Sequence, residues 1–147
     1  MKYIATIALS AMLVSSVFLT TGNAIAQLGP NVEQTYALIG YGGLVFGLAN
    51  VESDGKNLSI EISTPYVPSE GQEFEAWLVD DSGPGSGYYL SLGAINEDGN
   101  LNYTGYLVNA YTYTHIQVTS EPENDLDPKA AWSNTVGITK LVPPFGQ

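Results

Sequence analysis

The residues best suited to acid–base chemistry are the single histidine, His115, and the glutamate pair Glu73 and Glu75. His115 alternates with Ile116 and Val118, which places it on the solvent face of a predicted strand, where we expect it to stand alone. A metal site or a Ser-His-Asp relay needs further partners. Glu73 and Glu75 share a strand face with side chains about 7 Å apart, a separation found in glycosidases. We predict no catalytic residue, and keep this glutamate pair as the alternative.

Acidic loops are better candidates for binding than for catalysis. Their carboxylates are the hard oxygen ligands that Ca²⁺ prefers, although they do not follow the calcium-loop pattern D-x-[DN]-x-[DN]-G. The other interpretation is a solvated acidic loop without a bound ion. The candidate calcium ligands are Asp80, Asp81, Glu121, Glu123, Asp125 and Asp127.

Tyrosines gather in a short stretch of the sequence, where exposed rings could bind a sugar or a partner protein. The alternative is that they fill the edges of the sheet, since tyrosine favours strands. These candidate binding residues are Tyr103, Tyr106, Tyr111 and Tyr113. Asn57 and Asn102 each begin an N-x-[ST] pattern and are candidate N-glycosylation sites.

The elements that must position these residues are strands. The clearest is 58–63, where Leu58, Ile60 and Ile62 alternate with polar residues, as in a half-buried strand. Glycine and proline punctuate the chain between such runs, and no helix is predicted after the first 26 residues. The predicted strands are 36–40, 44–51, 58–63, 72–79, 88–95, 101–108, 111–120 and 135–141.

Residues 72–101 are predicted to form the centre of the fold. They contain a strand that becomes apolar on both faces at Trp77, a Gly/Pro/Asp loop, a second strand, and a turn at Asp98 and Gly99 into a third antiparallel strand. Asp54 and Gly55 signal another hairpin. Seven or eight short strands separated by turns favour an all-β fold, an antiparallel, immunoglobulin-like β-sandwich.

The first 26 residues have the features of a signal peptide. Lys2 precedes an apolar stretch at 4–19, and Ala24 and Ala26 form a small-x-small cleavage site. We expect the mature chain to begin at Gln27, with an irregular lead-in at 27–35, the β-domain at 36–142 and a tail at 143–147. A retained membrane anchor is the alternative. The prediction is therefore a secreted or cell-surface protein whose mature chain has no membrane span.

Composition excludes several functions. The mature chain keeps three lysines and no arginine against fifteen acidic residues, which leaves a net charge of −12. Such a surface repels nucleic acid, whose binding requires basic residues. Cysteine is absent, which excludes a cupredoxin copper site, iron–sulfur clusters, disulfides and a lipidated cysteine. We expect no cofactor, apart from the calcium hypothesis.

Four motifs, in order along the chain, resemble the extracytoplasmic C-terminal domain of anti-sigma-K factors. The resemblance covers about 58–138 and implies a β-fold in an extracytoplasmic setting, with no catalytic residues to transfer. The acidic stretch 123–127 departs from the family, which has a glycine-rich stretch there. We also expect only the leader, and not a sigma-binding domain, before the β-domain, so control of a sigma factor is not expected. The motifs are Phe74-Glu-Ala-Trp-Leu-Val79, Ser91-Leu-Gly93, Asp98-Gly99 and Ile116-Gln-Val-Thr-Ser-Glu-Pro122.

Two functions follow as hypotheses. The first is a non-enzymatic module of the cell exterior that binds an envelope or surface protein or serves as a structural subunit. It could associate with itself by strand addition, with residues 27–35 as the donor. The second is a carbohydrate-binding or glycan-active protein that uses the tyrosines and the glutamate pair.

Overall fold

The computed structural model describes residues 33–81, 87–126 and 132–146. The predicted all-β, antiparallel fold of seven to eight strands is confirmed, with three single-turn 3-10 helices between strands. The strands are β1 (Gln34–Ile39), β2 (Val45–Ser53), β3 (Asn57–Ser63), β4 (Gln72–Asp80), β5 (Tyr88–Ala94), β6 (Asn100–Tyr106), β7 (His115–Pro122) and β8 (Thr135–Lys140). The 3-10 helices are η1 (Tyr41–Gly43), η2 (Ala110–Thr112) and η3 (Trp132–Asn134).

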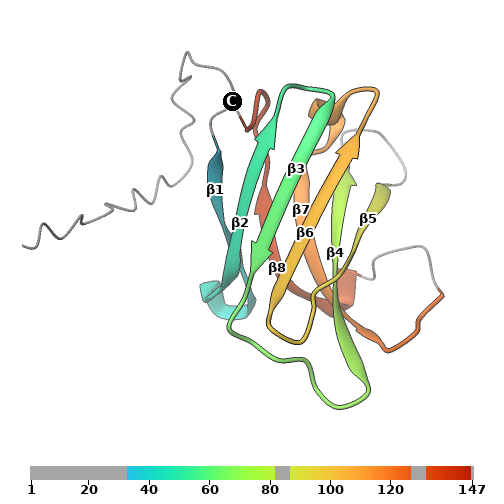
Figure 1. Ribbon diagram of the computed structural model, residues 1–147. Helices are drawn as coiled ribbons and strands as arrows, with labels where there is room; N and C mark the ends of the chain where they lie inside the picture. Colours follow the sequence, from blue (N-terminus) through green and yellow to red (C-terminus); the bar gives the residue numbers. More distant parts are fainter. Residues whose placement is uncertain (1–32, 82–86, 127–131, 147) are drawn as a thin grey trace, which may run out of the picture.

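All eight strands belong to one sheet with the order β5-β4-β7-β8-β1-β2-β3-β6, and every neighbouring pair is antiparallel. The sheet folds back on itself, so that β2, β3 and β6 face β8, β7 and β4 across the core (Figure 1). Its two halves join at the pairing of β8 with β1, which consists of the single residue pair Ile39 and Ile138. We call this junction the seam.

The prediction that 72–101 forms three successive paired strands is wrong in its last step. β4 and β5 pair as predicted, but β5 and β6 lie at opposite ends of the strand order, so neither is central. The turn at Asp98 and Gly99 carries the chain from one half of the sheet to the other. The Thr64 amide donates to the Gly99 carbonyl at 2.9 Å, which fixes this turn against the connection after β3. β6 then pairs along the whole of β3.

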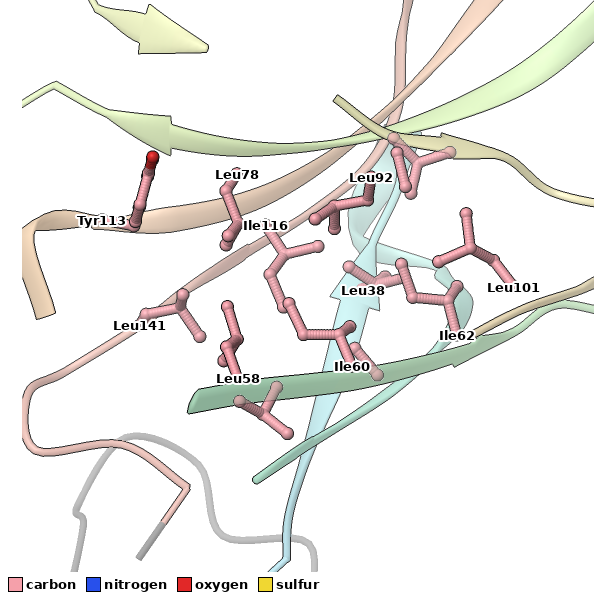
Figure 2. Close-up of a cluster of buried hydrophobic side chains, with 14 of the residues drawn as sticks. Leu38, Leu58, Ile60, Ile62, Leu78, Leu92, Leu101, Tyr113, Ile116 and Leu141 are labelled. Atoms are coloured by element: carbon pink, nitrogen blue, oxygen red, sulfur yellow. The ribbon is translucent and has the colours of Figure 1, made fainter. Parts of the chain in front are cut away.

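Inward-facing side chains from both halves form the core. Leu58, Ile60 and Ile62 of β3 are buried, which confirms the predicted alternation. Figure 2 shows them pointing toward Leu78 and Ile116 of the opposite half. β4 is also buried on its outer face, as predicted, because Trp77 and Val79 pack there with Tyr89 in a second, smaller cluster. β4 is thus covered on both faces, and it lies inside the sheet because it pairs with β5 on one side and β7 on the other.

The strand predicted at 111–120 begins later, at His115. Residues 110–112 form η2 instead, because the Asn109 side chain caps this turn by accepting a hydrogen bond from the Tyr111 amide at 3.0 Å. The Ala110 amide donates to the Gly55 carbonyl at 2.8 Å. The turn therefore docks on the β2–β3 hairpin, whose predicted Asp54–Gly55 position is confirmed by a φ of 91° at Gly55.

Both ends of the described chain contribute to the domain more than predicted. β1 begins at Gln34, inside the predicted lead-in, and Phe145 of the predicted tail is fully buried against Tyr111, with ring centroids 5.1 Å apart. The Ser53 amide donates to the Gly146 carbonyl at 2.8 Å, and the Gly146 amide to Gln34 Oε1 at 2.9 Å. The tail thus closes one end of the core.

The predicted signal peptide (1–26) and most of the lead-in lie outside the described residues. Among the residues that the structure does describe, no helix is long and apolar enough to cross a membrane.

Candidate functional site

The structure divides the predicted calcium ligands into two groups. Asp80 and Asp81 end β4, whereas Glu121 lies near the end of β7, and Glu123 and Asp125 follow it. Because β4 and β7 are antiparallel, with Val79 opposite His115, the two groups lie about 20 Å apart along the strands. Asp127 is outside the described residues. No group of three or more acidic or histidine side chains in the described ranges is arranged to hold a metal ion.

The prediction that His115 stands alone on a solvent-exposed face is wrong. Its side chain is only 21% exposed, and Nδ1 lies 2.9 Å from Thr114 Oγ1 and 3.5 Å from Asp81 Oδ2. The Thr114 hydroxyl also donates to the Asp81 carboxylate. The chain brings these groups together because Val79 pairs with His115, so the end of β4 meets the start of β7. The network ties these two strand ends together.

The four predicted binding tyrosines do not form an exposed aromatic face. Tyr113 is buried, Tyr103 packs against the core, and Tyr111 contacts Phe145, so only Tyr106 of the four is largely exposed, at 70%. The prediction failed for two reasons: Tyr103 and Tyr106 are three residues apart in β6 and so lie on opposite faces, and η2 takes Tyr111 out of any strand.

Tyr106 and Tyr113 nevertheless share an open depression of about 390 Å³, which we call the aromatic groove. Tyr88 extends it, because its ring centroid is 6.5 Å from that of Tyr113 and its side chain is 63% exposed. Burial raises the pKa of the Tyr113 phenol, as do the neighbouring Tyr88, Tyr103 and Asp80. Sequence reasoning missed Tyr88, which lies 25 positions before Tyr113. The groove is lined by Tyr106, Leu107, Val108, Asn109, Thr112 and Tyr113.

The candidate glycosylation residues Asn57 and Asn102 are both exposed, on the paired strands β3 and β6. Asn57 Nδ2 donates to Asp54 Oδ2 at 2.7 Å. Asn57 also borders an open depression of about 430 Å³ beside the β2–β3 turn, lined mainly by polar residues.

Glu73 and Glu75 share a face, as predicted, and the fold adds Glu121 to them. Register places Glu73 directly opposite Glu121, and Glu75 opposite Thr119. We call Glu73, Glu75 and Glu121 the carboxylate face. Ser91 Oγ donates to Glu75 Oε1 at 2.5 Å. Burial raises the pKa of the Glu75 carboxyl, the Ser91 hydrogen bond lowers it, and the nearby carboxylates of Glu73 and Glu121 raise it again.

The carboxylate face and the aromatic groove are separate sites. Glu75 is five residues before Asp80 on β4, about 17 Å along the strand, and Tyr88, at the edge of the groove, pairs with Asp80. The predicted glycan site that combined the tyrosines with the glutamate pair is therefore not brought together.

Sequence reasoning also missed an exposed apolar surface at the seam. Ile39 and Val45 lie opposite each other in β1 and β2, and the connection between them presents Tyr41, in η1, and Leu44, which follows η1. The available signal was the run 36–50, which has no charged residue. We call this surface the seam patch. Its members, each more than a third exposed, are Ile39, Tyr41, Leu44, Val45 and Leu48.

Comparison of the chain with protein-family models, with curated proteins and with solved structures found no match.

Proposed function

We propose that this chain is a non-enzymatic module of the cell exterior that acts by protein contact, as a self-associating surface subunit. Export is supported by the signal-peptide features of 1–26 and by the resemblance to the anti-sigma-K extracytoplasmic domain. The observation that carries the contact function is the seam patch, an exposed apolar surface on a strongly acidic chain. Exposed apolar patches of this kind are typical of interaction sites.

The charge of the chain favours a second copy as the occupant of the seam patch. With a net charge of −11, most faces of two copies repel each other. The seam patch belongs to a stretch without charges, so two copies can approach there without that penalty. An apolar contact of this type strengthens as salt screens the remaining repulsion.

The edge of β1 supports strand addition at the same place. Within the described residues, β1 pairs with β8 only through Ile39, so Gln34 to Leu38 have no strand partner on that side. An antiparallel pairing of β1 with the β1 of a second copy would extend both sheets next to the seam patch. Because Gln34 and Thr35 already belong to β1, they would act as an edge rather than as a detached donor.

Sedimentation velocity on residues 27–147 tests this function. We expect a concentration-dependent dimer that becomes tighter as NaCl is raised from about 0.05 M to about 1 M, a range over which the screening of surface charge increases strongly. Leu44→Asp should abolish the dimer. The matched control is Val108→Asp, which places the same charge at a 93% exposed apolar residue outside the seam patch and should leave the dimer intact. A monomer under all conditions, or equal loss in both variants, would contradict the proposal.

The aromatic groove favours glycan binding as a second candidate. Tyr106 and Tyr88 present exposed rings for stacking on a sugar, and Asn109 and Thr112 supply polar groups beside them. A glycan array with the chain tests this. Binding that is lost in Tyr106→Ala and kept in Tyr41→Ala, an exposed tyrosine of the seam patch, would support it. The absence of any glycan signal would remove this candidate.

A further inference from the structure

Two open depressions flank the end of β6, beside the β2–β3 turn (Figure 1). One is the aromatic groove, which Tyr106 lines. The other is the depression of about 430 Å³, which we call the polar depression; its polar lining includes Glu52, Asp54, Asn57, Ser59 and Thr104. Asn57 is directly opposite Tyr106 in the pairing of β3 with β6. Because such pairs have Cβ atoms about 5 Å apart, the two depressions adjoin at this pair.

The Asn57 side chain is held in one orientation although it is exposed. Asn57 Nδ2 donates to Asp54 Oδ2 at 2.7 Å, and Asp54 Oδ1 accepts from the backbone amides of Lys56 and Asn57 at 2.9 and 2.7 Å. These bonds, first that from the Asn57 side chain, lower the pKa of the Asp54 carboxyl, which therefore stays ionised. The Asn57 amide has a second N–H and a carbonyl oxygen to offer a ligand. A polar group fixed in advance loses less entropy on binding.

Hydroxyl groups and an aromatic ring complete this surface. Ser59 and Thr104 are directly opposite each other, and they share the outward face with Asn57 and Tyr106 because side chains alternate along a strand. The Tyr106 side chain is 70% exposed, so its ring is open to stacking. Sugars are bound by this combination, in which an aromatic ring covers the apolar face of the sugar while amides and hydroxyls bond its hydroxyl groups.

Charge at the two depressions disfavours an acidic glycan. Glu52 and Asp54 line the polar depression, and Asp80 lies near enough to the aromatic groove to raise the pKa of the Tyr113 phenol, after burial and the neighbouring tyrosines. Lys56, in the β2–β3 turn, balances only one of these acids. A chain of uronate or sulfated sugars would therefore be repelled.

We propose that the polar depression and the aromatic groove form one binding site for an extended, uncharged polysaccharide, with a sugar ring stacked on Tyr106 and its hydroxyls bonded to Asn57. The inference rests on the glycan-binding candidate above and narrows it to a class of ligand. Volumes of about 430 and 390 Å³ lie within the range of ligand sites. A chain of several sugars reaches both depressions, whereas a single sugar occupies only one.

Affinity gel electrophoresis tests the class of ligand, with the chain produced in a host without N-glycosylation so that Asn57 is unmodified. The neutral probes are xylan, galactomannan and β-glucan, and the acidic probe is polygalacturonate. In a buffer of about 0.01 M ionic strength, where charges are little screened, a neutral probe should retard the chain and polygalacturonate should not. By calorimetry, the hexasaccharide of that neutral probe should bind about tenfold or more tighter than its disaccharide. Retardation by no neutral probe, retardation by polygalacturonate, or equal affinity for the two lengths would overturn the proposal.

Substitutions test the polar depression separately from the aromatic groove. Asn57→Ala should weaken binding of the hexasaccharide about three- to tenfold, the loss expected for one hydrogen bond, and Thr104→Ala, which leaves the Asp54–Asn57 bond in place, should weaken it by a similar or smaller factor. The matched control is Asn102→Ala, which removes an exposed amide from the same face of β6, outside both depressions, and should leave binding unchanged.

The outcomes separate this inference from the glycan-binding candidate. Binding that is lost in Tyr106→Ala but unchanged in both Asn57→Ala and Thr104→Ala would overturn the inference and leave the candidate standing. A loss in Asn102→Ala as large as that in Asn57→Ala would also overturn it. The absence of any signal on the glycan array would remove both.

Discussion

The hydrogen bond from Trp77 Nε1 to Thr119 Oγ1, 2.9 Å long, joins two buried side chains on the outer face of β4 and β7. Thr119→Val keeps the shape but removes the acceptor, which leaves the indole N–H buried without a partner. We expect a loss of about 1–3 kcal/mol in the free energy of unfolding. Urea denaturation followed by tryptophan fluorescence measures it.

The matched control for Thr119→Val is Thr35→Val. Thr35 Oγ1 donates to Asn50 Oδ1 at 2.8 Å, but on an exposed surface where water replaces the lost bond. We expect a change of less than about 0.5 kcal/mol there. Equal effects of the two substitutions would show that the Trp77–Thr119 bond adds nothing specific.

Glu75 makes stability depend on pH. Its carboxyl has a pKa above the ordinary value of 4.5 in the folded state, chiefly because of burial. The folded chain therefore binds more protons than the unfolded chain, and this contribution to stability is present at acid pH and lost as the pH rises through the folded-state pKa. Glu75→Gln should stabilise the protein at pH 7, by no more than about 1 kcal/mol because the group is partly exposed.

The measurement for Glu75 is the free energy of unfolding of both proteins at several values of pH from about 3 to 7, the interval that spans an ordinary carboxyl titration. The difference between variant and wild type should grow with pH. A difference that is constant over this range would mean that Glu75 ionisation is not linked to folding.

At the scale of elements, the turn before β6 depends on Gly99. Gly99 and Gly71 have nearly the same backbone conformation, with φ of 78° and 76°, but a Cβ at Gly99 would lie 2.1 Å from the Thr64 carbonyl oxygen, while one at Gly71 meets nothing within 4 Å. Gly71→Ala should cost about 1–2 kcal/mol from conformation alone. Gly99→Ala should cost a further 1–3 kcal/mol or so, because the turn must move away from Thr64.

Thermal unfolding of the two glycine variants side by side tests this difference. A similar fall in melting temperature for both would contradict the role of Gly99 as the docking point between the two halves of the sheet.

The C-terminal segment acts as part of the core. Phe145 is fully buried on Tyr111, so Phe145→Ala should cost about 3–5 kcal/mol. Val142→Ala, at a half-exposed residue of the same segment, should change stability by less than about 0.5 kcal/mol. Guanidinium denaturation distinguishes the two; a Phe145→Ala variant as stable as Val142→Ala would show that the segment is dispensable.

At the scale of the whole molecule, the net charge of −11 opposes the compact state by self-repulsion. Raising NaCl from about 0.01 M to about 1 M shortens the Debye length from about 30 Å to about 3 Å. We expect the melting temperature to rise by roughly 2–6 °C, which corresponds to about 1 kcal/mol for a domain of this size. Choline chloride at the same ionic strength should raise the melting temperature by the same amount, since screening does not depend on the identity of the cation. A melting temperature that falls with salt would contradict this prediction.

The strand alternation and the turn chemistry were readable from the sequence because both depend on neighbouring residues. Leu58, Ile60 and Ile62 face the core for the reason that predicted them, which is the two-residue period of a strand. Asp54 and Gly55 turn where they were expected to, because few other residues accept a positive φ. The fold class, the number of strands and the burial of β4 on both faces near Trp77 could therefore be predicted without tertiary information.

Only the tertiary structure decided which strands became neighbours. The alternating pattern in 88–94 and 100–106 would fit two arrangements equally well: these two strands could pair with each other, or they could lie at opposite ends of the sheet. The outcome depends on the pairing of β5 with β4 and of β6 with β3. The tertiary structure likewise places Glu73 opposite Glu121 and buries Phe145 in the core. Pairing between segments tens of residues apart is governed by the free energy of the whole assembled sheet, which no local pattern contains.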